Sequence, residues 1–115
     1  MLKRRAERRL AGAAILFAAL GDPTRLGLIR RLAAGGSASI ATLAEGCPAM
    51  SRQGVTKHLQ VLASAGIVQG RRKGREHLWA LNPATIEEAR LSLDAIARHW
   101  DDRLARLKAH VEREA

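Results

Sequence analysis

Residues 51–62 have the sequence Ser-Arg-Gln-Gly-Val-Thr-Lys-His-Leu-Gln-Val-Leu, and this stretch decides the fold of the chain. Three apolar side chains recur at helical spacing and predict one buried face, namely Val55, Leu59 and Leu62. The other face is polar and carries Arg52, Gln53, Thr56, Lys57 and Gln60, while Ser51 stands at the start of the helix as its N-cap. Arginine pairs with guanine, glutamine with adenine, and serine, threonine and lysine with several partners. We therefore expect this helix to lie in a major groove with Ser51 and the polar face as its contacts; the alternative is a solvated surface helix.

The residues before this helix predict its setting. Residues 41–45 form a brief helix, residues 46–50 a tight turn, and the polar-faced helix then begins, so residues 41–64 are expected to form a helix-turn-helix. Upstream, we expect a basic lead-in over residues 1–9, frayed at its start, and a helix over residues 10–20. A second helix begins at Asp22-Pro23, where Asp suits the N-cap and Pro the first helical position. Its buried stripe is predicted to be Leu26, Ile29 and Leu32, and residues 37–40 to be a short extended or turn segment.

A basic hairpin follows the helix-turn-helix. Residues 67–70 and 76–81 read as two short strands that reverse near Gly74, so we expect a wing over residues 67–81. Four cations are expected at its tip, namely Arg71, Arg72, Lys73 and Arg75. They repel one another in isolation but are stabilised when they face phosphates or a narrow minor groove. The alternative is an exposed charged turn with no ligand.

One long helix is expected to complete the chain, over residues 84–112. Its apolar residues step by three and four along the whole length: Ile86, Ala89, Leu93, Ile96, Trp100, Leu104, Leu107 and Val111. Such a helix spans roughly 40 Å, more than one small domain covers. We therefore expect a second copy of the chain to cover Ile96, Trp100, Leu104, Leu107 and Val111, with Leu10 and Phe17 of the first helix at the same dimer surface. The alternative is that the long helix folds back along the first one.

Length, composition and charge limit the possible classes of protein. The 115 residues suffice for a single domain, residues 1–115. Hydrophobic residues make up 47% of the chain and aromatic residues only 3%, a composition that favours packed helices. The net charge of +9 is uneven: residues 1–9 carry about +4 and residues 51–77 about +5. Such basic patches favour a polyanion, nucleic acid before anionic membrane. Neither a membrane-length apolar run nor a secretory cleavage pattern is found, so we expect a cytoplasmic protein.

The motifs resemble the ArsR/SmtB (arsenic-repressor) family over nearly the whole chain. Residues 19–25, Ala-Leu-Gly-Asp-Pro-Thr-Arg, resemble that family's opening motif; residues 51–68 resemble its helix block, and residues 71–75 its wing. The resemblance implies a mainly α winged helix-turn-helix with a small β-hairpin wing and a long C-terminal dimerisation helix. It also implies a homodimeric bacterial repressor with base contacts at Arg52, Gln53, Thr56 and Lys57, and a structural role for His58.

Many members of this family sense metals, but the residues present do not match their sites. One family site uses cysteines in the helix before the recognition helix, and residues 41–45 contain none. Another uses the final helix, where His99 and His110 have the correct spacing but Ala97 and Arg113 occupy the other two ligand positions. Cys47 is the only cysteine, which excludes an intramolecular disulfide and the paired-cysteine redox sensors. We therefore expect no metal and no cofactor; the inducing signal, whether a small molecule, the protein's own level or none, stays open.

The sequence thus predicts a double-stranded-DNA-binding transcriptional regulator, a homodimeric repressor that blocks a promoter and does not bind membranes. The alternative is an RNA-binding or ribosome-associated basic protein. That alternative lacks the exposed aromatic residues that stack single-stranded bases, because Phe17, Trp79 and Trp100 are the only aromatic residues. An enzyme is not expected: Ser51 and His58 lie two helical turns apart, and no paired carboxylates or phosphate-binding glycine loop are present.

Overall fold

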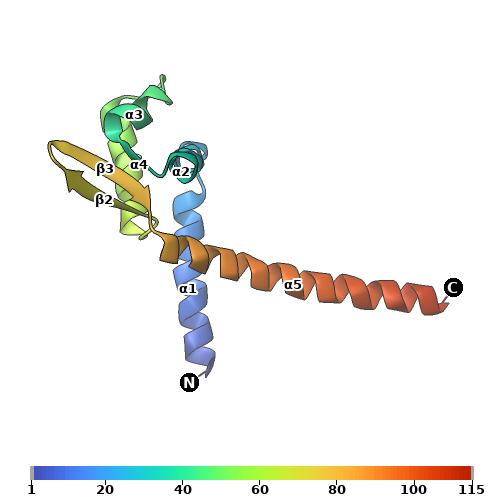
Figure 1. The fold of residues 1–115 in the computed structure, drawn as a ribbon. Coiled ribbons are helices and arrows are strands. Elements are labelled where there is room, and N and C mark those ends of the chain that lie inside the picture. The colour runs from blue at the N-terminus through green and yellow to red at the C-terminus, as the bar shows by residue number, and fades with distance from the viewer. Residues whose placement is uncertain (1, 115) are drawn as a thin grey trace.

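The computed structural model describes residues 2–114 and has the element order of a winged helix-turn-helix (Figure 1). In chain order the elements are α1 (Leu2–Leu20), α2 (Pro23–Gly35), β1 (Ser37–Ser39), α3 (Ile40–Glu45), α4 (Arg52–Ser64), β2 (Val68–Lys73), β3 (Glu76–Leu81) and α5 (Pro83–Glu114). The predicted fold class is confirmed, with helices predominant, one small sheet and a long final helix.

The core lies between α1, α2, α3 and α4 and is closed by the base of the sheet. Its buried side chains are Leu16, Ala19, Leu28, Leu32, Leu43, Val55, Leu59, Leu62, Ile67, Val68 and Trp79. The predicted stripe of α4 is fully buried, but that of α2 is wrong in part. Leu28 is buried there and Leu26 is 47% exposed, because α2 is turned so that Leu28 and Leu32, one helical turn apart, face the core.

The sheet has three strands rather than the two expected, in the antiparallel order β1-β3-β2. Residues 37–39 do form an extended segment, as predicted, but they also pair with β3, Ser37 opposite Ala80 and Ser39 opposite Leu78. The hairpin reverses at Gly74, whose φ of 64° is a left-handed conformation that glycine adopts without strain. Because α3 begins directly after β1, the third strand joins the hairpin to the helix-turn-helix.

The first helix begins earlier than expected. The sequence predicts a basic lead-in over residues 1–9, frayed at its start, and a helix only from residue 10, but α1 is helical from Leu2 and runs without a break to Leu20. Residue 1 lies outside the described residues. Leu, Lys, Arg, Ala and Glu are all good helix formers, so the basic segment continues the helix that the apolar residues after it establish.

The last helix projects away from the rest of the molecule (Figure 1). It has 32 residues, so it is about 48 Å long at 1.5 Å per residue. Only its first turns pack on the core, through Ile86 and Ala89, and it crosses α1 instead of running beside it (Figure 1). The alternative in which this helix folds back along α1 is therefore wrong.

Among residues 2–114, no single helix is long and apolar enough to cross a membrane; α1 and α2 reach that threshold only when taken together across a bend of 95°.

Candidate nucleic-acid interface

The two faces of α4 have opposite environments. Val55, Leu59 and Leu62 have no exposed surface, whereas the side chains of Arg52, Gln53, Lys57 and Gln60 are exposed. Because these three apolar side chains are buried, the rotation of α4 about its axis is fixed, and the polar residues all face outward. The predicted contact residues of α4 are thus brought onto one accessible surface.

Two hydroxyl groups in this set are already engaged. The Ser51 hydroxyl oxygen accepts a hydrogen bond from the Gly54 amide at 3.1 Å and so caps α4. The hydroxyl of the half-buried Thr56 donates to the Arg52 carbonyl oxygen at 2.9 Å. Ser51 can still donate its proton to a ligand, but Thr56 can only accept while its internal bond is kept. Arg52, Gln53, Lys57 and Gln60 are accordingly the freer donors.

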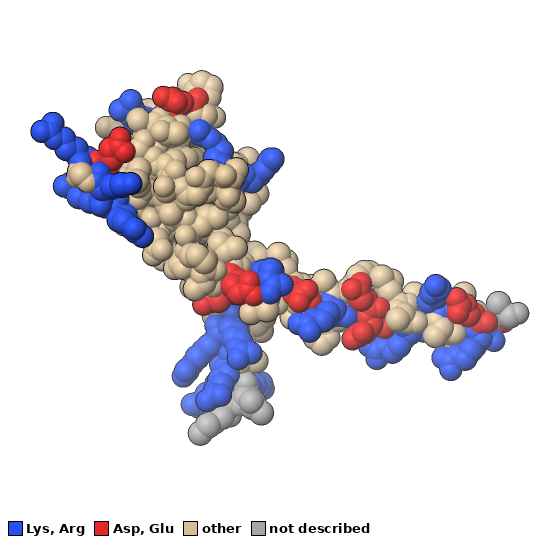
Figure 2. All heavy atoms as spheres, in the orientation of Figure 1, with Lys and Arg blue, Asp and Glu red and all other residues tan. Residues whose placement is uncertain are grey.

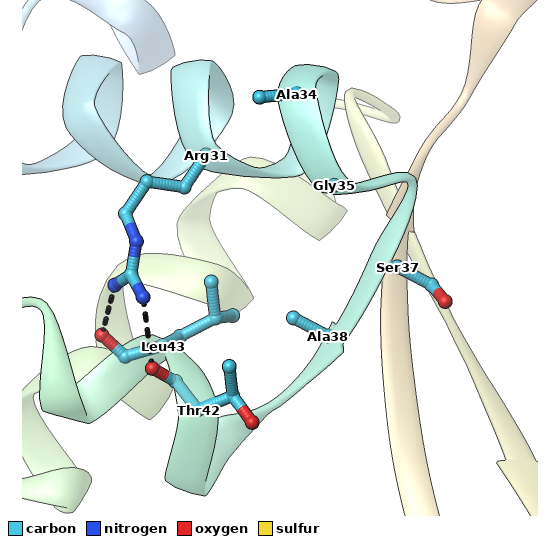
Figure 3. Close-up of a pocket in the computed structure, with 7 residues that line it drawn as sticks. All are labelled: Arg31, Ala34, Gly35, Ser37, Ala38, Thr42 and Leu43. Carbon is cyan, nitrogen blue, oxygen red and sulfur yellow. Dashed lines mark hydrogen bonds between the residues drawn. The ribbon is translucent and has the colours of Figure 1, made fainter.

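An arginine that the sequence pattern does not single out holds α3 in place. Arg31 reaches from α2 and donates to the carbonyl oxygens of Leu43 at 2.6 Å and Thr42 at 2.9 Å (Figure 3). Cations near the last carbonyls of a helix satisfy their hydrogen bonds and oppose the helix dipole. The guanidinium also occupies the space that a side chain at Gly46 would need. Arg31 thereby fixes the helix and the turn that precede α4, and only the fold reveals that pairing.

A shallow depression of about 410 Å³ adjoins this contact (Figure 3). Its lining residues are Arg31, Ala34, Gly35, Ser37, Ala38, Thr42 and Leu43. The guanidinium there is already bonded to two carbonyl groups, so this depression presents no free cation.

A polar junction holds α4 against the α1–α2 corner. Asp22 caps α2 by accepting from the Arg25 amide at 3.0 Å, and the Arg25 side chain donates to the Ala19 carbonyl oxygen at the end of α1. The His58 Nδ1 atom lies 3.3 Å from the Arg25 guanidinium and 3.9 Å from the Asp22 carboxylate. His58 therefore faces this junction and lies away from the exposed face of α4.

The hydrogen bond from the Arg25 amide lowers the pKa of Asp22 below its ordinary value of 3.8, and the charges of Arg25 and His58 act in the same direction. A carboxyl whose pKa is depressed in the folded state contributes stability above its unfolded pKa and loses it as the pH falls through the folded value. We expect the melting temperature of the wild type to fall more steeply below about pH 4 than that of Asp22→Asn.

Thermal unfolding followed by circular dichroism, from about pH 7 down through the ordinary pKa of an aspartate, measures this difference. Asp101→Asn, which removes an exposed carboxylate from α5, serves as control and should keep the wild-type acid response. Superimposable pH curves for the wild type and Asp22→Asn would contradict the assignment.

The wing places its four cations differently from the prediction. Arg71, Arg72 and Lys73 belong to β2 itself, opposite Leu78, His77 and Glu76, and only Arg75 lies in the turn. Because side chains alternate along a strand, Arg71 and Lys73 share one face of the ribbon and Arg72 points to the other. All four side chains are exposed. The cations thus flank the hairpin on both faces rather than cluster at its tip.

The base of the wing is anchored by aromatic packing. The His77 ring stacks on Trp79 with a centroid distance of 4.7 Å and an interplanar angle of 26°, and Trp79 is only 8% exposed. His77 also covers Gly70, where a larger residue would overlap its ring. The cationic end of the hairpin is therefore carried on a packed base.

Among the described residues, the exposed cations of α4 and the wing form no ion pair, although Glu76 lies opposite Lys73 in the hairpin. Within the described part of the chain, the ion pairs involve only His58, Arg90, Arg98, Lys108 and His110. None of the exposed cations of α4 or the wing takes part. Figure 2 shows lysine and arginine gathered on the hairpin, while α5 carries both signs interspersed. Unpaired cations on one surface are the electrostatic arrangement that phosphate groups require.

The candidate dimer residues lie on exposed helices. No residue of α5 is buried, and the exposed fractions are 64% for Ile96, 60% for Trp100, 45% for Leu104, 59% for Leu107 and 57% for Val111. On α1, Leu10 is 71% exposed, whereas Phe17 is half-buried. The structure also exposes Ile15 to 60% on α1, a residue outside the predicted dimer surface.

In residues 2–114, no three histidine, cysteine or acidic side chains are close enough to hold a metal ion together. His99 and His110 lie on α5 with eleven residues of rise between them, about 16 Å, so they cannot share an ion within one protomer.

Comparison with known proteins gives the family. A model described as a helix-turn-helix domain matches residues 20–71. The HTH-type transcriptional regulator Rv2034 of Mycobacterium tuberculosis is 38% identical over 82 residues, which cover 71% of this chain and 72% of that protein.

Solved structures agree. An ArsR-like transcriptional regulator from Rhodococcus sp. RHA1 is 35% identical with a TM-score of 0.72, covering 86% of this chain and 92% of that one. A structure described as a possible transcriptional regulator for arsenical resistance is 34% identical with a TM-score of 0.65, covering 83% and 93%. With its helix-turn-helix and wing, the chain belongs to the ArsR family of DNA-binding transcriptional regulators and is not an enzyme.

Proposed function

We propose that this regulator is a homodimeric repressor that binds a two-half-site duplex and blocks a promoter. The observation that carries the proposal is the division of α4 into a fully buried apolar stripe and an exposed face of Arg52, Gln53, Lys57 and Gln60. A helix held firmly on one side and polar on the other can enter a major groove without rearranging its own core.

The two basic elements would take different parts in binding. The exposed side chains of α4 would contact base edges, where arginine and glutamine can form paired hydrogen bonds. Arg71, Arg72, Lys73 and Arg75 would contact phosphates on either side of the hairpin, which gives affinity that depends on salt but not on base sequence. We propose that Ser51 and Thr56 contribute secondary contacts through the groups that their internal bonds leave free.

The apolar residues of α5 support assembly through a two-fold axis. Ile96, Trp100, Leu104, Leu107 and Val111 follow one side of the helix, beyond the point where it leaves its own core. Contiguous exposed apolar surface of this kind marks an interaction site. A second copy would cover it, with Leu10 and Phe17 of α1 beside it, and would set two α4 helices about 34–36 Å apart, one turn of DNA.

Selection from a random duplex pool tests this function directly. We expect the recovered sequences to share an inverted repeat, and duplex RNA to compete poorly with the selected DNA. Recovery of no preferred sequence, or equal competition by RNA, would contradict the proposal. Repeating the binding measurement with metal ions, with chelator and with oxidant identifies any signal that releases the DNA.

Arg52→Ala is expected to lower affinity by roughly 1–3 kcal/mol and to relax base preference at one position of each half-site. The reason is the loss of a paired hydrogen bond to a base edge. Arg30→Ala, which removes an exposed arginine from α2, is the matched control and should leave base preference unchanged. Titrations with the selected duplex and with single-base variants measure both effects; an equal loss on specific and random duplexes would argue against a base contact.

A further inference from the structure

The first half of α1 carries a charged patch that lies apart from α4 and the wing. Arg4, Arg5, Arg8 and Arg9, here called the α1 arginine cluster, are all exposed. None of them appears in an ion pair in the structure as described for residues 2–114. Figure 2 shows this group as a continuous basic surface on the part of α1 that extends from the body of the protein.

The position of the cluster is unfavourable for the helix that carries it. The start of a helix has positive dipole character, and α1 has no acidic residue in its first turn. Arg4 and Arg8, and likewise Arg5 and Arg9, are like charges at i and i+4, which destabilises a helix. Helix propensity outweighs these two penalties, since α1 is helical from Leu2, and an anionic ligand would remove both of them.

The cluster shares a side of α1 with the residues that enter the core. Arg9 precedes Leu16 by seven residues and Arg5 precedes it by eleven, which are close to two and three full helical turns. Leu16 is buried in the core against which α4 packs. Because α1 is continuous, the core fixes the direction in which these arginines extend.

We infer that the α1 arginine cluster binds phosphates of the duplex outside the base pairs that α4 contacts. This inference rests on the proposed function. Several unpaired guanidinium groups on one rigid helix suit a repeating row of phosphates, which arginine binds in paired hydrogen bonds.

Two other occupants fit the cluster less well. A helix that lies on an anionic membrane needs several bulky apolar side chains opposite its cations. Residues 3–9 offer only Ala6 there, and the exposed Leu10 that follows them is covered in the proposed dimer. The partner's α5 has acidic residues, but on this chain's α5 several are paired within the helix, Asp94 with Arg98 and Glu112 with Lys108.

The test compares two duplexes from the selection experiment, one ending at the selected sequence and one with about ten further base pairs, one helical turn, on each side. The variant replaces all four arginines by glutamine, R4Q/R5Q/R8Q/R9Q. The control, R90Q/R98Q/R106Q/R113Q, makes the same change in charge on exposed arginines of α5. Affinities are measured across a range of salt concentrations.

We expect the wild type and the control to bind the longer duplex more tightly and with a steeper salt dependence. The cluster variant should lose that advantage, and the slope of log K against log salt should become shallower by about 0.9 for each phosphate that an arginine no longer neutralises. Its melting temperature should not fall, because removing the cations relieves repulsion within α1.

Several results would overturn the inference. These are an unchanged slope on both duplexes, a variant that sediments as a monomer, or a variant that loses binding only to vesicles of phosphatidylserine and phosphatidylcholine. If the wild type prefers no duplex at all, the proposed function fails and the inference fails with it, whereas an unchanged variant beside a binding wild type overturns the inference alone.

Discussion

Leu104→Glu combined with Leu107→Glu is expected to convert the protein into a monomer and to weaken its binding to the selected duplex about 10²–10⁴-fold. Both leucines lie on the exposed apolar side of α5, where they are 45% and 59% exposed. Two carboxylates there would have to be buried without partners in the proposed dimer, which costs more than the apolar packing contributes. The two half-sites are then bound independently, and the advantage of binding both at once disappears.

Sedimentation velocity measures the assembly state, and titrations of duplexes with one and two half-sites measure the linkage. The matched control is Ala105→Glu combined with Ala109→Glu, which adds the same charge on the opposite side of α5. The control should stay dimeric and bind as the wild type does. A double-leucine variant that remains a dimer, or a control that dissociates equally, would show that the apolar side of α5 is not the dimer surface.

Leu59→Ala is expected to lower the free energy of unfolding by about 2–5 kcal/mol. Leu59 has no exposed surface and lies in the core between Val55 and Leu62, so its truncation leaves a cavity that the neighbouring elements cannot fill. A decrease of this magnitude is a large part of the stability of a small domain. DNA binding should fall with it at temperatures near the new melting point, because α4 is the element that loses its support.

Denaturant titrations at one protomer concentration measure this change, since the stability of a dimer depends on concentration. Val61→Ala on the same helix is the control; Val61 is 43% exposed, and its truncation should change stability far less. A Leu59→Ala variant as stable as the Val61→Ala variant would mean that the α4 stripe does not carry the core.

The sequence predicts well those parts of the fold that depend only on residues close to one another in the chain. The apolar spacing of Val55, Leu59 and Leu62 defines the buried side of α4 without knowledge of its neighbours, and the Ser51 cap marks where the helix begins. Asp22 and Pro23 mark the start of α2 in the same way, and the structure confirms the cap. Once the buried side of α4 is known, the polar residues on its other side are predicted to be exposed.

The parts that the sequence does not predict depend on tertiary contacts. Residues 37–39 are too short to be recognised as a strand until β3 lies beside them. The rotation of α2 that buries Leu28 instead of Leu26 depends on where α4 packs, and the partners of Arg25 and Arg31 depend on which carbonyl groups the fold brings near. The early start of α1 does not depend on tertiary contacts. It differs from the prediction because the helix propensity of residues 2–9 outweighs the repulsion between their charges.

The pairing of β1 with β3 has a mechanical consequence. The strand residue Ser39 is also the N-cap of α3, so one short segment is hydrogen-bonded to the hairpin on one side and begins the helix-turn-helix on the other. The base of the hairpin is therefore joined to α3, because residues 37–39 pair with residues 78–80 and Ser39 begins that helix. In the proposed complex, exchange of the outward side chains of α4 would change which bases are contacted and leave this junction between the hairpin and α3 intact.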